Sequence, residues 1–188
     1  MTRYFKLMDD RRSQTRWHLG APVDEQEEEI DPWQFDEGRV LELGCVPHLP
    51  LDIPGRPLDF CWAAFSILVV SDRFVRLFER LNVHEVQFIP TRIQGHEEEP
   101  WFILNPLRVI RCIDDARCAE VQYWKPEDGQ PEKLGEYRVV AGLRIDPTKV
   151  GDTRIFRPWG WRVALVVSED LKQALEQEGI TGTKFIAV

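Results

Sequence analysis

The sequence has no apolar run long enough to span a bilayer and no segment typical of an export signal. Its first residues, Met1–Arg12, carry charges where a signal peptide requires an apolar core. We therefore expect a cytoplasmic protein with no membrane partner. The length of 188 residues suits one domain with a sizeable core, and we treat residues 1–188 as that domain, with possible subregions 1–62 and 63–188.

Cysteine and histidine are scarce, with four of each. None of the cysteines is paired at Cys-x-x-Cys spacing, and no histidine has a second His or Cys at ligand spacing, so the sequence indicates no metal site and no cofactor. We expect free thiols in or near the core. Cys112 and Cys118 could meet across a turn, but we do not expect a disulfide. The run Glu97–Glu99 could hold a metal, although such runs are usually solvated.

The sequence also lacks a recognisable catalytic motif. Ser71 and Ser168 do not stand in a Gly-x-Ser-x-Gly setting, and their positions favour helix capping instead. No glycine-rich loop that could cradle a phosphate is present. Cys61 or Cys112 could act with a histidine as a thiol enzyme, but nothing near them in the sequence supports this. The sequence therefore indicates a protein that is not an enzyme, with a small enzyme of dispersed active-site residues as the alternative.

Acidic residues and tryptophans are what the chain has in excess. The formal net charge is −8, which disfavours a nucleic-acid partner and makes a basic protein partner easier to accommodate. Seven tryptophans are many for this length, and tryptophan is enriched on protein contact surfaces. A hydrophobic fraction of 43% is typical of a packed globular protein.

The clearest pattern in the sequence occurs twice. A short Val-rich apolar run leads to Ser71, and a similar run leads to Ser168, 97 residues later. Runs of this length and composition are typical of buried strands. Acidic residues follow each serine, where the helix dipole favours them, and apolar residues then recur at helical spacing. Asn82 and Gly179 stand where a left-handed turn would end each helix. The pattern predicts two capped helices, at about residues 72–81 and 169–178, in a repeated strand–helix–strand unit.

The rest of the chain shows shorter strand-like segments without regular alternation with helices. This pattern predicts an α+β fold with a largely antiparallel or mixed β-sheet. Pro47–Pro57 should run extended over the surface, and Asn105-Pro106 should break a strand. The strands are predicted at Tyr4–Leu7, Val40–Leu43, Glu85–Ile93, Trp101–Leu104, Leu107–Ile113, Glu120–Trp124 and Tyr137–Ile145.

One loop concentrates acidic residues and is followed directly by aromatic ones. It contains no base, and its acids are Asp24, Glu25, Glu27, Glu28, Glu29 and Asp31, with Trp33 and Phe35 next in the chain. The simpler interpretation is a mobile solvated loop pinned by two core aromatics. The functional one is a docking edge, in which the acids steer a basic partner and Trp33 anchors it. A weaker second patch is formed by Glu97, Glu98 and Glu99.

A short segment alternates arginine with aromatic residues, at Arg154, Arg157 and Arg162 among Phe156, Trp159 and Trp161. Such a pattern can bind single-stranded nucleic acid. The segment is short, lies in an acidic protein and adjoins a predicted core strand. We therefore favour a structural cluster, in which the arginines stack on tryptophans or pair with acids.

Several segments, taken in order, resemble family eleven of the immunity proteins of bacterial polymorphic toxin systems, a family of the myxobacterial type that was formerly a domain of unknown function. The resemblance covers most of the chain. The segments are Tyr4–Leu7, Trp17–Pro22, Trp33–Phe35 with Gly38, Leu58–Phe60, Val70-Ser71, Phe88–Ile93 with Gly95, Phe102–Asn105 and Cys112–Asp114.

The resemblance implies a cytoplasmic antitoxin for interbacterial competition and kin discrimination, which binds a cognate secreted toxin and neutralises it. It implies no catalytic residues and gives no interface residues. The acidity of the chain suggests a basic toxin, such as a nuclease, and a monomer or weak homodimer is expected. A self-associating structural module built on exposed tryptophans is a further alternative.

Overall fold

The polypeptide forms two five-stranded β-sheets in the computed structural model, which describes residues 2–12 and 15–188. Neighbouring strands are antiparallel except in the β9–β12 and β3–β7 pairs, which are parallel. The predicted α+β class with a largely antiparallel sheet is confirmed. In order, sheet A contains β14 (Thr183–Ala187), β1 (Tyr4–Asp9), β13 (Leu165–Ser168), β12 (Ile155–Pro158) and β9 (Val109–Ile110). Sheet B contains β3 (His48–Leu49), β7 (Val86–Ile93), β8 (Trp101–Pro106), β6 (Leu68–Ser71) and β5 (Phe60–Trp62).

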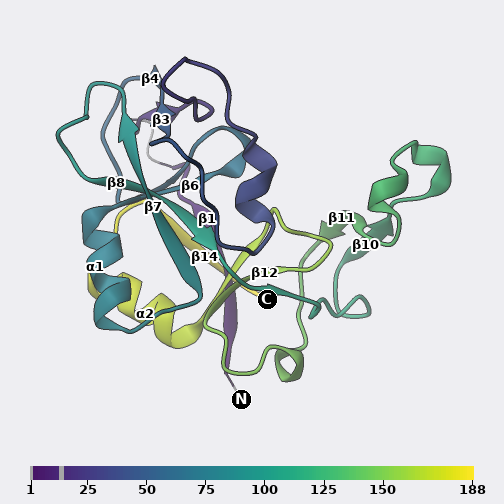
Figure 1. The fold of residues 1–188 in the computed structure, drawn as a ribbon. Coiled ribbons are helices and arrows are strands. Elements are labelled where there is room, and N and C mark those ends of the chain that lie inside the picture. Colours follow the sequence, from purple (N-terminus) through teal and green to yellow (C-terminus); the bar gives the residue numbers. More distant parts are fainter. Residues whose placement is uncertain (1, 13–14) are drawn as a thin grey trace.

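Two α-helices occur in the described residues, and both follow a central strand directly. Helix α1 (Asp72–Arg80) follows β6 and α2 (Glu169–Gln177) follows β13, so the predicted repeat is confirmed. The helices contact each other and lie side by side at one corner of the molecule (Figure 1). Asn82 and Gly179 end them at φ values of 50° and 67°, the predicted left-handed turn.

The two helices begin differently, and one predicted cap is wrong. The Ser71 Oγ accepts a hydrogen bond from the Phe74 amide at 3.4 Å, as expected for a cap. Ser168 makes no such bond, and its buried Oγ has no partner among the described residues. The first amide of α2, on Glu169, instead donates to the Arg3 carbonyl at 2.9 Å, because β1 lies alongside β13 at this point.

The core is shared by both sheets and both helices. Leu7 and Leu165 of sheet A lie in one apolar cluster with Leu68 and Val70 of sheet B and with the apolar faces of the helices. The opposite faces of the sheets are covered separately. Trp17 and its neighbours pack on the far side of sheet B, whereas residues around Cys112 and Ile145 pack on the far side of sheet A. Strands β6 and β13 are therefore buried on both faces, which explains their uninterrupted apolar sequence.

The predicted strand at Val40–Leu43 is wrong. This segment is not a strand, because its backbone hydrogen bonds are made with side-chain amides and not with the backbone of a neighbouring strand. The Gln87 amide group accepts from the Leu41 N–H at 2.9 Å and donates to the Leu41 carbonyl at 2.8 Å. The Asn105 Nδ2 donates to the Arg39 carbonyl at 2.9 Å. The segment is thus held against sheet B without joining it.

Other strand ends differ from the prediction. Strand β8 continues through Asn105 to Pro106, because a proline that ends a strand need not donate to the ladder. The proline-rich segment contributes two short strands, β3 and β4 (Leu51–Ile53), and β4 pairs with β2 (His18–Leu19). Only Val109–Ile110 of the predicted 107–113 strand is extended in a ladder. Strand β11 (Tyr137–Ala141) ends before Gly142, which turns the chain at a φ of 56°.

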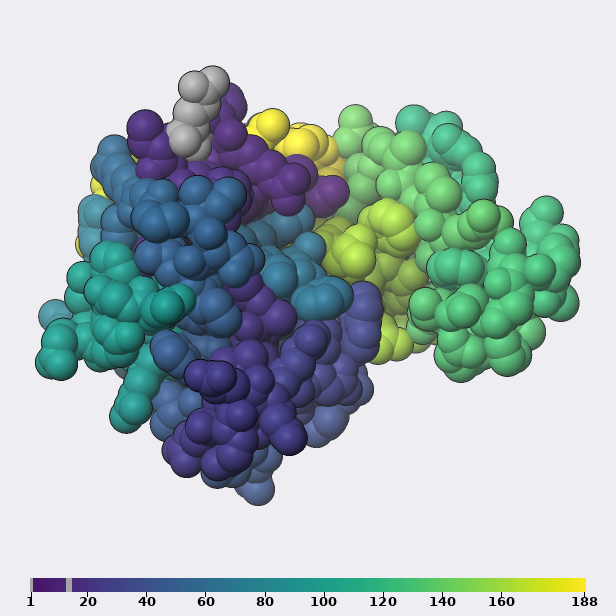
Figure 2. Space-filling model, turned by 90° about the horizontal axis from the view of Figure 1, so that it is seen from above, coloured from purple at the N-terminus to yellow at the C-terminus, as the bar shows by residue number. Residues whose placement is uncertain are grey.

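A two-stranded hairpin stands out from the rest of the molecule (Figures 1 and 2). It pairs β10 (Glu120–Tyr123) with β11, and we call residues 120–141 the arm. Its tip carries the 3-10 turns η3 (Pro126–Asp128) and η4 (Pro131–Lys133). Three more such turns lie in the body: η1 (Pro32–Asp36), η2 (Ala64–Ser66) and η5 (Pro147–Lys149). Within the described ranges, no helix has the length and apolar character needed to cross a membrane.

Gly182→Ala should destabilise the fold because the chain after α2 passes against β5 at this glycine. A Cβ on Gly182 would lie 2.0 Å from the Phe60 carbonyl oxygen. Gly95→Ala is the matched control, since Gly95 also has a positive φ but has no atom within 4 Å of the added Cβ. In urea unfolding, we expect Gly182→Ala to lose about 1–3 kcal/mol more than Gly95→Ala. Equal losses would contradict the proposed contact.

Candidate binding surfaces

The acidic loop is held in shape by its own first and last carboxylates. The Asp24 Oδ1 accepts hydrogen bonds from the amides of Gln26 at 2.8 Å and Glu28 at 3.0 Å. The Asp31 Oδ1 accepts from the Trp33 amide at 3.0 Å and so caps η1. These two predicted interface residues therefore also have a structural role. The four predicted interface glutamates between these aspartates are exposed, and their side chains make no hydrogen bond or ion pair with any described residue. They are Glu25, Glu27, Glu28 and Glu29.

The structure brings the two predicted acidic patches together. Asp24, Glu25 and Glu27 line a hollow of about 220 Å³ together with Glu97, which comes from the turn between β7 and β8. We call this site the acidic hollow. The backbone amide of Gly95 donates to the Glu97 carboxylate at 2.8 Å and lowers its pKa, which keeps it ionised. Arg92 and His48 also line the hollow, so it is acidic in balance but contains basic groups.

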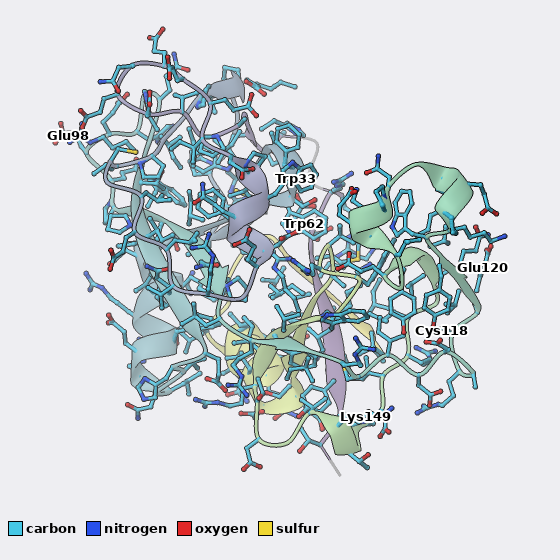
Figure 3. All side chains as sticks on the ribbon, turned by 45° about the vertical axis from the view of Figure 1, so that its right-hand side comes forward. Trp33, Trp62, Glu98, Cys118, Glu120 and Lys149 are labelled. Atoms are coloured by element: carbon cyan, nitrogen blue, oxygen red, sulfur yellow. The ribbon has the colours of Figure 1, made fainter. Side chains whose placement is uncertain are left out.

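Of the remaining acids in the second patch, neither lines the hollow. Glu99 is engaged with His96, whose Nδ1 lies 3.1 Å from a Glu99 carboxylate oxygen. Glu98 is exposed and lies at the outer edge of the molecule (Figure 3). Both can extend the negative surface around the hollow without contributing to its walls.

Trp33 lies apart from the acidic hollow. It is 59% exposed, and Figure 3 shows it on the side of the molecule that faces the arm, far from Glu98. Its ring meets the ring of Phe65 edge-on at 5.8 Å, and Phe65 is itself 53% exposed. The sequence placed Trp33 next to the acids because it follows them in the chain, but η1 turns it toward a different surface.

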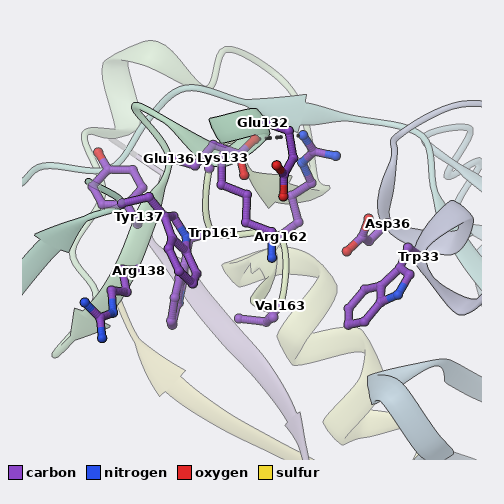
Figure 4. Close-up of a pocket in the computed structure, with 12 residues that line it drawn as sticks. Trp33, Asp36, Glu132, Lys133, Glu136, Tyr137, Arg138, Trp161, Arg162 and Val163 are labelled. Carbon is purple, nitrogen blue, oxygen red and sulfur yellow. Dashed lines mark hydrogen bonds and ion pairs between the residues drawn. The ribbon is translucent and has the colours of Figure 1, made fainter. Parts of the chain in front are cut away.

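That surface is a cleft between η1, the arm and the turn before β13 (Figure 4). It has a volume of about 460 Å³, and we call it the aromatic cleft. Its aromatic lining consists of Trp33, Trp124, Tyr137 and Trp161. Its charged lining consists of Asp36, Glu132, Lys133, Glu136, Arg138 and Arg162.

Most of the charged groups in the cleft are already engaged. The Arg162 Nη2 donates to the Glu136 carboxylate at 3.1 Å, and Arg138 pairs with Asp128 at 2.7 Å. Lys133 lies over the Trp124 ring, with its Nζ 5.0 Å from the ring centre. In contrast, Asp36 and Glu132 make no hydrogen bond or ion pair within the described part of the chain.

A buried arginine lies behind the cleft. Arg157 on β12 is 3% exposed, and its Nη1 donates to the Arg162 carbonyl at 2.6 Å, while its Nε has no partner among the described residues. Burial lowers its pKa to about 10, and nearby Asp36 opposes this. Burial also raises the pKa of Asp36, although Arg157 and Arg162 act in the opposite direction. The two groups therefore stabilise each other's charge across the base of the cleft.

Sequence reasoning missed the residues of the arm that complete this cleft. Trp124 and Tyr137 flank the turn of a hairpin. An aromatic residue on each side of a polar turn was the sequence pattern that could have indicated an exposed aromatic surface there. Nothing local indicates that Asp36 and Glu132, nearly a hundred residues apart, would face one cleft. Their proximity depends on the way the arm stands over η1.

The Arg–Trp segment makes contacts that agree with a structural role. Arg154 donates to the carbonyl oxygens at the end of α1 at 3.0 and 2.6 Å, and Arg162 pairs with Glu136. Trp159 is covered by the guanidinium of Arg111, which lies 3.5 Å from the ring centre. Each of these charged groups is engaged within the protein, so the segment is not a free basic patch.

The residues considered as nucleophiles are engaged or buried. Ser71 donates to the Asp59 carboxylate at 2.8 Å in addition to capping α1, and Ser168 is 1% exposed. Burial raises the pKa of Cys61 and of Cys112 to about 12, so both remain protonated thiols at neutral pH. The four cysteines are free. No group of three His, Cys, Asp or Glu side chains within residues 2–12 and 15–188 could hold a metal ion.

The model of a family described as "Immunity protein family (Imm11)" matches residues 8–188. No curated protein matches the chain.

The thiols provide a test of the buried sites. With a disulfide reagent such as DTNB at pH 8, we expect native Cys61 and Cys112 to stay unmodified over minutes, because a pKa of about 12 leaves almost no thiolate. Cys45 and Cys118, which are both partly exposed, should react first. All four thiols should react in urea. Rapid labelling of Cys61 or Cys112 in the native protein, located by peptide mass spectrometry, would show that a reactive thiol site had been overlooked.

Proposed function

The chain belongs to the Imm11 family of immunity proteins, and on this premise we propose that it is the cytoplasmic antitoxin of a polymorphic toxin system. In this proposal it binds a cognate secreted toxin and neutralises it by covering the toxin's active surface. The mechanism requires a stable scaffold with a complementary exterior and no chemical step. The engaged serines and protonated buried thiols agree with inhibition by occlusion.

The toxin is proposed to present a basic surface, as a nuclease does toward its substrate. A net charge of −8 attracts such a protein over long range, and local clusters of carboxylates direct how it arrives. An acidic inhibitor can occupy the surface that the toxin would otherwise use to hold the phosphates of a nucleic acid.

One observation carries this proposal: the acidic loop and the β7–β8 turn meet in the acidic hollow. The loop is shaped by Asp24 and Asp31, and the glutamates between them have no partner within the described residues. Carboxylates that lack an intramolecular cation remain available to a cation on another protein. The loop therefore combines a defined backbone with four free negative charges.

The function is tested by expressing the toxin domain encoded next to this gene. We expect that domain to stop growth when it is expressed alone, and to be harmless and to copurify when it is expressed with this chain. Growth arrest despite full expression of both proteins would contradict the proposed function.

The acidic loop is tested by replacing Glu25, Glu27, Glu28 and Glu29 with Gln, which leaves the loop-shaping aspartates in place. We expect association with the toxin to slow by about 10-fold or more at low salt and to become less sensitive to salt, as measured by stopped flow. A control with the same change in charge replaces exposed acids elsewhere: Glu42→Gln, Glu79→Gln, Glu127→Gln and Asp152→Asn.

The control should change the association rate much less, because its acids are distributed over different surfaces. Equal effects of the two variants would mean that only the net charge matters. Unchanged rates in the loop variant would remove this loop from the interface.

A further inference from the structure

The aromatic cleft has features of a binding site that its own chain leaves unfilled. Two of its aromatic walls, Trp33 and Trp161, come from η1 and from the turn before β13, while a third, Tyr137, comes from the arm. Three segments that are distant in sequence thus border an open cleft of about 460 Å³, large enough for a long side chain with part of its backbone.

The charges of the cleft favour a cation. Arg162 and Arg138 have carboxylate partners, and Lys133 lies over Trp124. The carboxylates of Asp36 on η1 and Glu132 on the arm make no hydrogen bond or ion pair within the described residues, although Asp36 lies near the buried Arg157. Aromatic faces also attract cations, so the aromatic lining and the carboxylates of the cleft both favour a positively charged ligand group.

Apolar side chains gather at the mouth of the cleft. Trp33, Phe65 and Val163 are 59%, 53% and 48% exposed, and they also line a small cavity together. Phe65 and Ser66 have φ values of 57° and 58°, a left-handed conformation that is costly for a bulky residue. The strained turn thus holds the Phe65 side chain outward, against the exposed ring of Trp33.

We propose that the aromatic cleft is the anchor site for the toxin and receives an arginine or lysine side chain from it. This inference rests on the proposed function. The cation enters between Trp33 and Trp161, where Asp36 and Glu132 neutralise it, and the toxin surface around it covers Phe65 and Val163. The occupant is a basic protein segment, because a positively charged protein surface also complements the acidic hollow. Anchoring in an aromatic cleft acts on dissociation, whereas the acidic loop acts on association.

The first test uses the complex with the toxin domain encoded next to this gene. The variant Asp36→Asn with Glu132→Gln removes two carboxylates of the cleft, Glu132→Gln alone leaves the attraction between Asp36 and Arg157 in place, and Trp33→Ala removes an exposed wall. We expect all three variants to dissociate faster, the double variant and Trp33→Ala by at least about 10-fold, with little change in association rate. Glu42→Gln with Glu79→Gln is the control of equal charge, and it should dissociate like the unmodified protein.

The second test needs no toxin. The probe is the peptide acetyl-Gly-Arg-Gly-amide, compared with the same peptide carrying citrulline, which has nearly the shape of arginine but no charge. In NMR titrations, we expect the arginine peptide to shift the indole N–H signals of Trp33 and Trp161 saturably, and more strongly than the citrulline peptide. These signals are assigned by the Trp33→Phe and Trp161→Phe variants. The Asp36→Asn, Glu132→Gln variant should lose the difference between the peptides.

The two tests separate the possible failures. If the peptide binds in the cleft but the toxin is not neutralised, the proposed function fails, and with it the toxin as occupant, while the preference of the cleft for cations stands. If the toxin is neutralised but dissociation is unchanged in all cleft variants, the inference is overturned and the proposed function stands. Equal binding of the arginine and citrulline peptides would also overturn the choice of a cation.

Discussion

Burial of β6 and β13 on both faces is the constraint on which the rest of the structure depends. One face of each strand packs into the core shared with the helices. The other face points away from that core, and its residues Val69 and Val166 are fully buried under separate covering segments. Each sheet therefore needs a second covering layer. The chain supplies it with the segments around residues 15–53, which precede the first repeated unit, and 107–150, which lie between the two units. These coverings hold the loops that carry the acidic hollow and the aromatic cleft.

The two repeated units are also joined by arginines at the ends of their helices. Arg73 of α1 donates to the carbonyl oxygens of Glu178 and Gly179 at the end of α2. Arg154, which precedes β12, does the same at the end of α1. A cation at a helix C-terminus satisfies free carbonyls and interacts favourably with the helix dipole. The ends of the helices are thus held by residues from outside each helix.

A rigid framework with two different exterior sites suits an inhibitor that acts by covering its target. The acidic hollow presents unpaired carboxylates on a loop of defined shape, and such groups influence mainly the approach of a charged partner. The aromatic cleft is open to solvent and lined in part by tryptophans, the residue type that most often contributes large binding energies at protein interfaces. Both sites lie outside the shared core, so changes in them can alter the choice of partner with little effect on the fold.

The sequence by itself determined the features that depend on neighbouring residues. The two helices, the cap at Ser71, the left-handed turns at Asn82 and Gly179 and the buried strands before the helices were predicted, because each follows from local spacing and backbone preference. The outline of the acidic loop was predicted for the same reason, although its contact with a partner stays a prediction. The errors occurred where distant groups replaced local ones, as when Gln87 and Asn105 bound the backbone of residues 39–41 and when β1 took over the cap of α2.

Only the tertiary structure decided which side chains share a surface. It separated Trp33 from the acids that precede it, brought Glu97 to the acidic loop, and placed Asp36 opposite Glu132 across the aromatic cleft. No pattern along the chain encodes these neighbours, since they arise from the docking of the arm and of η1 on two different sheets. Hydrophobic periodicity reports whether a residue faces the core, but it carries no information on which exposed residues from distant segments lie side by side.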